Sequence, residues 1–176
     1  EEDNYRLRVE EYEKRLTPET KMVLLSSPNN PTGRVFTREE LTELSQFIIK
    51  HDLICVCDQA FEDTAFPGHE MVTMASLPGM WERTVTVCSC SKGMALSGYR
   101  VGYIFADDVI MDTMYATAVN IQGAANTMVQ MAMIPAYEDT SFIQDYVAEQ
   151  DFRRRYAYEK FNAVPGVSMP LMESGF

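Results

Sequence analysis

The sequence predicts an α/β fold with a mostly parallel sheet and helices on both of its faces. Short apolar runs typical of buried strands alternate with segments of helical periodicity, and a polar or turn-forming residue closes each run. Such runs need crossover helices between them, so the alternation favours βαβ units. The chain has 176 residues, of which 46% are hydrophobic, which is enough for a sizeable core.

The first strand is expected over residues 21–27, "KMVLLSS", and the breaker-rich turn "PNNPTG" follows it. A helix should begin after Thr37, because Thr37 and Glu40 have the spacing of a capping box. This helix should end near His51. Four apolar residues recur at helical spacing and define its buried face: Leu41, Leu44, Phe47 and Ile48.

Three further strands are expected over residues 53–57, "LICVC", 84–90, "TVTVCSC", and 101–106, "VGYIFA". The first two are short apolar runs, each closed by a polar residue. Between them, residues 60–78 contain prolines and a glycine and should be irregular. A short helix is expected within this segment, near residues 71–75.

Helices are also expected over residues 108–119, 124–137 and 140–163, the second of them ending around Pro135. The charged opening stretch and the abrupt stop after a glycine indicate a piece of a longer protein, cut at both ends. We therefore expect one incomplete fold unit and the beginning of another.

Three regions are predicted. Residues 1–139 form part of a large domain, and residues 140–163 form a long connecting helix. Residues 164–176 begin a second, smaller domain, because the pattern changes at "VPG".

The net charge is −11, which argues against partners such as nucleic acid or an anionic membrane surface. No apolar run reaches the length of a membrane span, and no signal peptide is recognisable. The cysteines form two C-x-C pairs within strands, a spacing that favours buried free thiols over a metal site. Free thiols suit a reducing compartment, so a cytoplasmic location is expected.

Polar side chains follow three of the predicted strands, each at the point where the strand ends. Asn30 follows the first strand and Asp58 the second, while Ser89, Ser91 and Lys92 follow the third. Parallel strands place their carboxyl ends along one edge of a sheet, and ligands bind in the crevice outside that edge. These side chains are therefore expected to converge there.

The chemistry of this set matches pyridoxal 5′-phosphate. A lysine amine condenses with an aldehyde to form a Schiff base, and a carboxylate keeps a ring nitrogen protonated. An amide donates to a phenolic oxygen, and hydroxyls with a guanidinium such as that of Arg100 bind phosphate. Each residue taken alone is more simply a surface lysine, a cap, a turn former or an ion-pair partner. Their joint placement favours the site, while for Ser91 both readings stay open.

The motifs resemble those of the class I/II aminotransferases, the fold-type-I pyridoxal-phosphate-dependent enzymes. "SSPNNPTGRVFTREEL" resembles the family's N-P-x-N-P-T-G turn and the helix after it, and "CVCDQAFED" its D-x-x-Y segment. "SCSKGMALSGYRVGYIF" is similar to its S-x-S-K…G-x-R-x-G-Y block. The resemblance implies that the chain is the large cofactor-binding domain of this fold, truncated at both ends.

The resemblance also implies roles for these residues. Lys92 forms the Schiff base and then moves the substrate proton, Asp58 pairs with the ring nitrogen, and Asn30 binds the phenolic oxygen. The phosphate ligands it implies are Ser89, Arg100 and, as a weaker candidate, Ser91.

The chain departs from the family pattern at Phe61, where the family usually has a tyrosine that also donates to the phenolic oxygen. The lost donor is expected to raise the Schiff-base pKa. The family's glycine-containing phosphate loop and the aromatic residue that stacks on the ring would lie upstream of residue 1. The arginine that binds the substrate carboxylate would lie downstream of residue 176.

The implied activity is that of an amino-acid aminotransferase, which moves an amino group between an amino acid and a 2-oxo acid. The full-length protein is expected to be a homodimer with these small molecules as substrates. A C–S lyase or a decarboxylase with the same cofactor stays open, as does a folded but inactive fragment, because these motifs serve all three. The amino donor is not determined.

Overall fold

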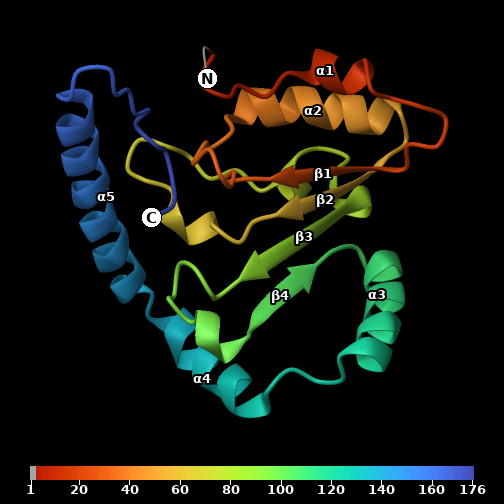
Figure 1. Ribbon diagram of the computed structural model, residues 1–176. Helices are drawn as coiled ribbons and strands as arrows, with labels where there is room; N and C mark the ends of the chain where they lie inside the picture. The colour runs from red at the N-terminus through yellow and green to blue at the C-terminus, as the bar shows by residue number, and fades with distance from the viewer. Residues whose placement is uncertain (1–2) are drawn as a thin grey trace.

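The computed structural model describes residues 3–176 and shows a four-stranded sheet in the order β1-β2-β3-β4 (Figure 1). Strands β1 (Met22–Ser26), β2 (Ile54–Asp58) and β3 (Thr84–Ser89) are parallel. Strand β4 (Gly102–Phe105) runs antiparallel to β3. The predicted α/β fold with a mostly parallel sheet is confirmed. The first two residues of the predicted large domain lie outside the described part of the chain.

The register of the strands brings their carboxyl ends level along one edge of the sheet. Ser26 is the partner of Asp58, and Asp58 is the partner of Val87. The chain turns back into β4 at this edge. A β-carbon on Gly102 would lie 2.6 Å from the carbonyl oxygen of Cys88, so the close approach of β3 and β4 requires glycine there.

Helix α2 (Arg38–Lys50) covers one face of the sheet (Figure 1). The predicted capping box is present, since Glu40 N donates to the Thr37 hydroxyl and Thr37 N donates to the Glu40 carboxylate. Burying one leucine or isoleucine side chain stabilises a fold by about 1.5–3 kcal/mol. The buried side chains of the helix and of the strands beneath it include Leu41, Leu44, Phe47, Ile48, Val23, Leu25, Cys55 and Cys57.

Within residues 3–176, a helix covers the opposite face of the sheet only near β4. Helix α3 (Asp108–Ile121) stands beside β3 and β4 there, across a hollow lined by Val87 and Ile104. On β1, Met22 is 58% exposed and Leu24 is 71% exposed. The predicted helices are present on both faces, but they cover the second face only in part.

The remaining α-helices are α1 (Val9–Glu13), α4 (Thr127–Glu138) and α5 (Ser141–Asn162). The predicted long helix is confirmed by α5, whereas α1 was not predicted. The predicted helix over residues 124–137 corresponds to α4, which runs past Pro135 and ends at Glu138. A proline lacks only its own N–H, and Asp139 N donates to the Pro135 carbonyl at 3.2 Å and closes the next turn.

Four short 3-10 helices complete the fold: η1 (Glu62–Thr64), η2 (Met74–Ser76), η3 (Trp81–Arg83) and η4 (Ser97–Tyr99). The short helix predicted near residues 71–75 corresponds to η2, three residues further along. The rest of the segment between β2 and β3 is irregular, as predicted.

The cysteines are buried free thiols, as predicted. Burial raises the pKa of Cys55 to about 12 and that of Cys57 even further above the usual range of a thiol. Among residues 3–176, no group of three or more histidine, cysteine or acidic side chains is arranged to hold a metal ion. None of the helices in the described part of the chain has the length and apolarity needed to cross a membrane.

After α5, residues 164–176 return to the carboxyl edge of the sheet, and the chain ends beside η1 (Figure 1). Ser174 forms an antiparallel bridge with Ala65, and its N–H donates to the Gly33 carbonyl at 2.9 Å. This last segment therefore packs on the same unit as the strands. The division of the chain into two domains and a connecting helix stays a prediction.

Candidate active site

Asn30 lies in the turn after β1, which the backbone holds in one shape. Asn29 accepts the Gly33 N–H at 2.8 Å through its carbonyl, and Gly33 has a φ of +68°, which favours glycine. The peptide bonds Ser27–Pro28 and Asn30–Pro31 are both cis. The turn leaves the Asn30 side chain exposed at the carboxyl edge.

Asp58 is the last residue of β2, and its carboxylate is exposed. Ala60 N donates to Asp58 Oδ1 at 2.9 Å, which is the one hydrogen bond of this carboxylate among the described residues. The strand register and the alternation of side chains place Asp58, Val87 and Ser89 on the same face of the sheet. The carboxylate is therefore open to a ligand at the end of the central parallel strand.

Lys92 follows β3 and is half-buried between two aromatic rings. Its Nζ lies 5.6 Å from the centroid of the Phe61 ring and 5.8 Å from that of Phe176. Within residues 3–176 the ammonium has no hydrogen bond and no ion pair. A β-carbon on Gly93 would lie 2.4 Å from Asp63 Cβ, so glycine allows the turn to pack closely. An amine held in place without a carboxylate partner is available to react with a ligand.

Ser89, Ser91 and Arg100 line a common hollow of about 600 Å³ between the β3–β4 pair and α3. Ser91 N donates to Ser89 Oγ at 3.2 Å, which leaves that hydroxyl free to donate. The Arg100 guanidinium donates to the Ser97 carbonyl at 2.7 Å, and Arg100 has a φ of +54°. Hydroxyl and guanidinium donors around one hollow form a suitable anion site.

Asn30 and Lys92 line a second, smaller hollow of about 280 Å³, together with Phe61. Ser91 lines the first hollow and the next residue, Lys92, lines the second. The two hollows therefore adjoin at this point of the chain. Asp58 lines neither hollow and stands on the strand between them. The candidate residues thus share one edge of the sheet but occupy adjoining sites rather than a single crevice.

Residues of the last segment also line the smaller hollow, and sequence analysis did not assign them to the site. They are Met172, Ser174, Gly175 and Phe176. The Phe176 ring lies 5.8 Å from that of Phe61. No spacing in the sequence places these residues beside Lys92.

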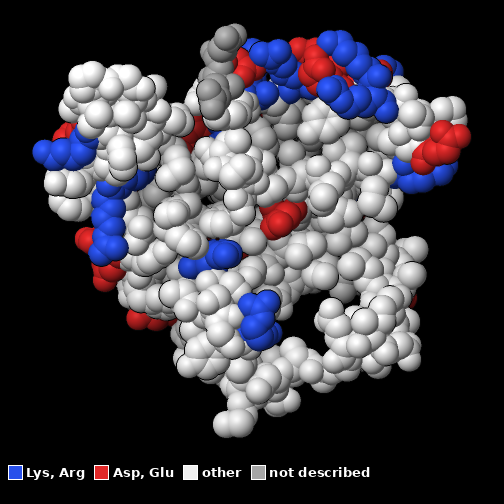
Figure 2. Space-filling view, viewed as in Figure 1, with Lys and Arg blue, Asp and Glu red and all other residues white. Residues whose placement is uncertain are grey.

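Another hollow, of about 440 Å³, lies between α1 and β1 and is lined by none of the candidate residues. Figure 2 shows that charged side chains gather over α1 and along α5 on the viewed face. The surface near the ends of β2 and β3 carries only scattered basic and acidic groups amid uncharged atoms. A small anionic ligand would therefore depend on specific donors such as the Arg100 guanidinium, because the protein as a whole has a net charge of −11.

A mostly parallel sheet with a lysine, an amide, a carboxylate and phosphate-type donors at its carboxyl edge defines an α/β ligand-binding domain of the kind found in cofactor-dependent enzymes. The whole chain, residues 1–176, matches the family described as "Aminotransferase class I and II". The chain belongs to this family.

Named relatives agree with this assignment. The chain is 35% identical to aromatic-amino-acid aminotransferase 2 of Thermococcus litoralis, over 89% of this chain and 39% of the relative. It is 32% identical to an aspartate aminotransferase of Musicola paradisiaca, over 91% of this chain and 40% of the relative. The crystal structure of an aromatic aminotransferase from Pyrococcus horikoshii OT3 superposes with a TM-score of 0.94 at 32% identity, covering 99% of this chain and 48% of that one. The chain thus spans less than half the length of these proteins.

Proposed function

We propose that the full protein is an amino-acid aminotransferase that uses pyridoxal 5′-phosphate and transfers an amino group between an amino acid and a 2-oxo acid. The observation that carries this proposal is the Lys92 amine, which has no hydrogen bond or ion pair among residues 3–176 and shares a hollow with Asn30 that adjoins the donors of Ser89 and Arg100. Membership of the family and the names of the relatives support it.

The residues present fit this cofactor by the chemistry of their donors. Ser89 and Arg100 would hold the phosphate, and the Asn30 amide would donate to the ring oxygen. To do so, Arg100 exchanges its bond to the Ser97 carbonyl for the phosphate. Asp58 would hold the ring nitrogen, since one of its oxygens has no hydrogen bond from the described residues.

When bound, pyridoxal phosphate supplies an electron sink for the negative charge that develops at the substrate Cα. Lys92 would hold the cofactor through its amine, and the same amine would take the proton from the substrate Cα. The Phe61 and Phe176 rings lie 5.6 and 5.8 Å from its Nζ. The Asp58 carboxylate favours a protonated ring nitrogen because opposite charges stabilise one another.

A product assay tests the proposed activity. The protein, with cofactor, is given a panel of amino acids that includes aromatic ones and aspartate, with and without a 2-oxo acid. We expect no more than one equivalent of new 2-oxo acid per bound cofactor without an acceptor, because the amino group stays on the cofactor, and continued formation when the acceptor is present to remove that amino group. Ammonia and thiol released from a cysteine conjugate without an acceptor, or carbon dioxide from the donor, would indicate a lyase or a decarboxylase instead. Bound cofactor without turnover would indicate an inactive fragment.

We further propose that the full-length protein works as a homodimer in the cytoplasm, with amino acids and 2-oxo acids as its small-molecule substrates. The buried free thiols suit a reducing compartment. Sedimentation of the full-length protein tests the oligomeric state, and a monomer that turns over substrate would contradict a required dimer.

Phe61→Tyr is expected to lower the pKa of the Lys92 nitrogen in the cofactor-loaded protein. The Phe61 ring shares a hollow with Asn30 and Lys92, so a hydroxyl there would donate to the cofactor ring oxygen and favour its anionic form. A hydrogen bond to a charged acceptor is worth about 1.5–3 kcal/mol. At 1.36 kcal/mol per unit this gives a shift of about one to two units. Displacement of a water from the same position would reduce it.

Spectrophotometric titration of the loaded protein measures this shift directly. Phe152→Tyr is the matched control, because Phe152 is 66% exposed on α5. An unchanged or raised pKa in Phe61→Tyr would show that residue 61 does not face the ring oxygen.

A further inference from the structure

We infer that Arg34 and Glu173 form a clamp that positions one wall of the Lys92 hollow. Both are positioning residues: they touch neither Lys92 nor the space in front of it, and they act through residues 172–176. The geometry of the clamp is independent of the proposed function, and only its importance for catalysis rests on that function.

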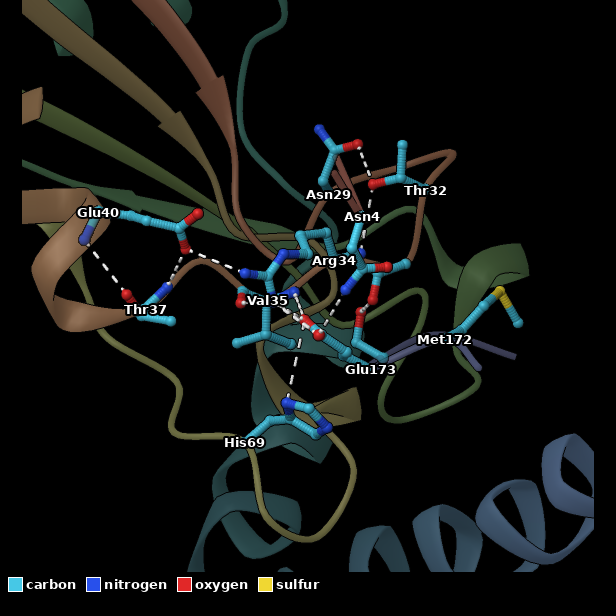
Figure 3. A network of polar contacts seen from close by, with 12 residues as sticks. Asn4, Asn29, Thr32, Arg34, Val35, Thr37, Glu40, His69, Met172 and Glu173 are labelled. Carbon is cyan, nitrogen blue, oxygen red and sulfur yellow. Dashed lines mark hydrogen bonds and ion pairs between the residues drawn. The ribbon is translucent and has the colours of Figure 1, made fainter. Parts of the chain in front are cut away.

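The clamp is a buried network of charges around the turn after β1 (Figure 3). Arg34 Nη1 donates to both carboxylate oxygens of Glu173, at 2.6 and 2.5 Å. Arg34 Nη2 donates to Glu40 Oε2 at 3.3 Å, and Val35 N donates to Glu173 Oε2 at 2.8 Å. One guanidinium thus bridges the start of α2 and the last segment of the chain, and Arg34 and Glu173 are separated by 139 positions.

Because this ion pair is buried, losing one of its partners costs more free energy than it would in an exposed ion pair. The side chains of Arg34 and Glu173 are 15% and 12% exposed, and that of Glu40 is 6% exposed. Removing one partner of such a pair leaves a buried charge without compensation, which disfavours the packed arrangement strongly. His69 Nδ1 lies 3.9 Å from Glu173 Oε2 and is the other ionisable group at this carboxylate in the described part of the chain.

Backbone hydrogen bonds hold Glu173 and the residue after it in place. The N–H groups of Glu173 and Ser174 donate to the Gly33 carbonyl at 3.0 and 2.9 Å, and Phe66 N donates to the Glu173 carbonyl at 2.9 Å. A β-carbon on Gly33 would lie 2.9 Å from Met172 Cβ, so the two segments are in close contact. The last segment is therefore held on the turn that carries Asn30.

Phe176 follows this anchored stretch by two residues and reaches the site. Its ring lies 5.8 Å from Lys92 Nζ and 5.8 Å from the Phe61 ring. The clamp therefore fixes the segment that carries Phe176, whose ring forms part of the wall of the Lys92 hollow. If the ion pair is lost, this segment loosens and Lys92 becomes more accessible.

The test uses the protein without cofactor or substrate and measures two quantities. Amide hydrogen exchange reports on the N–H groups of Glu173 and Ser174. The rate of acetylation by an N-hydroxysuccinimide ester, followed by peptide mass spectrometry, reports on the exposure of Lys92. Acetylation of the exposed Lys21 is the internal reference.

The main variant is Glu173→Gln, which keeps the shape of the side chain and removes its charge. We expect these amides to exchange roughly 10- to 150-fold faster, the equilibrium factor of one charge-assisted hydrogen bond. The rate of Lys92 acetylation should rise at least about threefold, because the segment of residues 172–176 opens more often. Arg34→Lys should give smaller changes of the same sign, because an ammonium keeps the charge but cannot bridge two carboxylates as a planar fork does.

The control is Arg38→Lys, which makes the same chemical change four residues along the chain. Arg38 pairs with Glu70 at 2.6 Å, but both side chains are more than half exposed, at 52% and 65%. This variant should leave the exchange and acetylation rates unchanged.

Two results would overturn the clamp. Unchanged amide exchange in Glu173→Gln would show that the ion pair does not hold the segment. Faster exchange with unchanged Lys92 acetylation would show that the segment does not form the wall. Neither result bears on whether the loaded protein is a transaminase, which the product assay decides separately.

Discussion

Lys92→Ala is expected to eliminate covalent attachment of the cofactor and to lower turnover by at least about 10²- to 10⁴-fold, the usual contribution of a general acid–base group. The alanine variant loses both the amine that reacts with the aldehyde and the base that takes the substrate proton. Lys92 is suited to both roles because its amine is half-buried between two rings and has no carboxylate partner among residues 3–176.

Reduction with borohydride, digestion and mass spectrometry measure the attachment. The wild-type protein should carry the reduced cofactor on the peptide that contains Lys92, and Lys92→Ala should carry none. Lys50→Ala is the control, because Lys50 is an exposed lysine at the end of α2 that pairs with Glu13 at 2.7 Å. A modified peptide containing Lys50 or another lysine would defeat the assignment.

Asp58→Asn is expected to lower the pKa of the cofactor's ring nitrogen by about one to three units, the shift that an adjacent opposite charge produces. The ring would then be largely unprotonated at neutral pH, and turnover should fall by about 10- to 1000-fold, since one unit corresponds to tenfold. The structure supports this because the Asp58 carboxylate is exposed at the end of β2 and one of its oxygens has no hydrogen bond from the described residues.

Asp52→Asn is the matched control for this prediction. Asp52 lies just before β2, at the opposite end of the strand from Asp58, and its side chain is 94% exposed beside Arg83. The absorbance of the bound cofactor and the rate of turnover should both respond to the change at residue 58 and not to the change at residue 52. Equal effects of the two substitutions would show that Asp58 is only a strand-end residue.

Much of the fold could be predicted because its signals are local. The Thr37–Glu40 capping box, the apolar face of α2 and the alternation along β2 are patterns within a few residues, and the structure contains them all. The end of α4 could not be predicted from Pro135. The position of that end depended on whether the turn after the proline could still form its backbone hydrogen bond, from Asp139 N to the Pro135 carbonyl.

The candidate groups and the edge of the sheet at which they lie could be predicted from the sequence. Asn30, Asp58 and Lys92 each follow a strand, and parallel strands bring such positions to one edge whatever the packing around them. Their division between two adjoining hollows depended on the turns after the strands, which no periodicity describes.

The contribution of Phe176 to the wall of the Lys92 hollow could be identified only from the tertiary structure. Phe176 comes to lie beside Lys92 because a buried ion pair and the Gly33 carbonyl hold residues near 173 on the turn after β1. No spacing of residues in the sequence predicts a contact between segments so far apart in the chain. Its stability depends on the desolvation of the charges involved, and only the folded arrangement sets that desolvation.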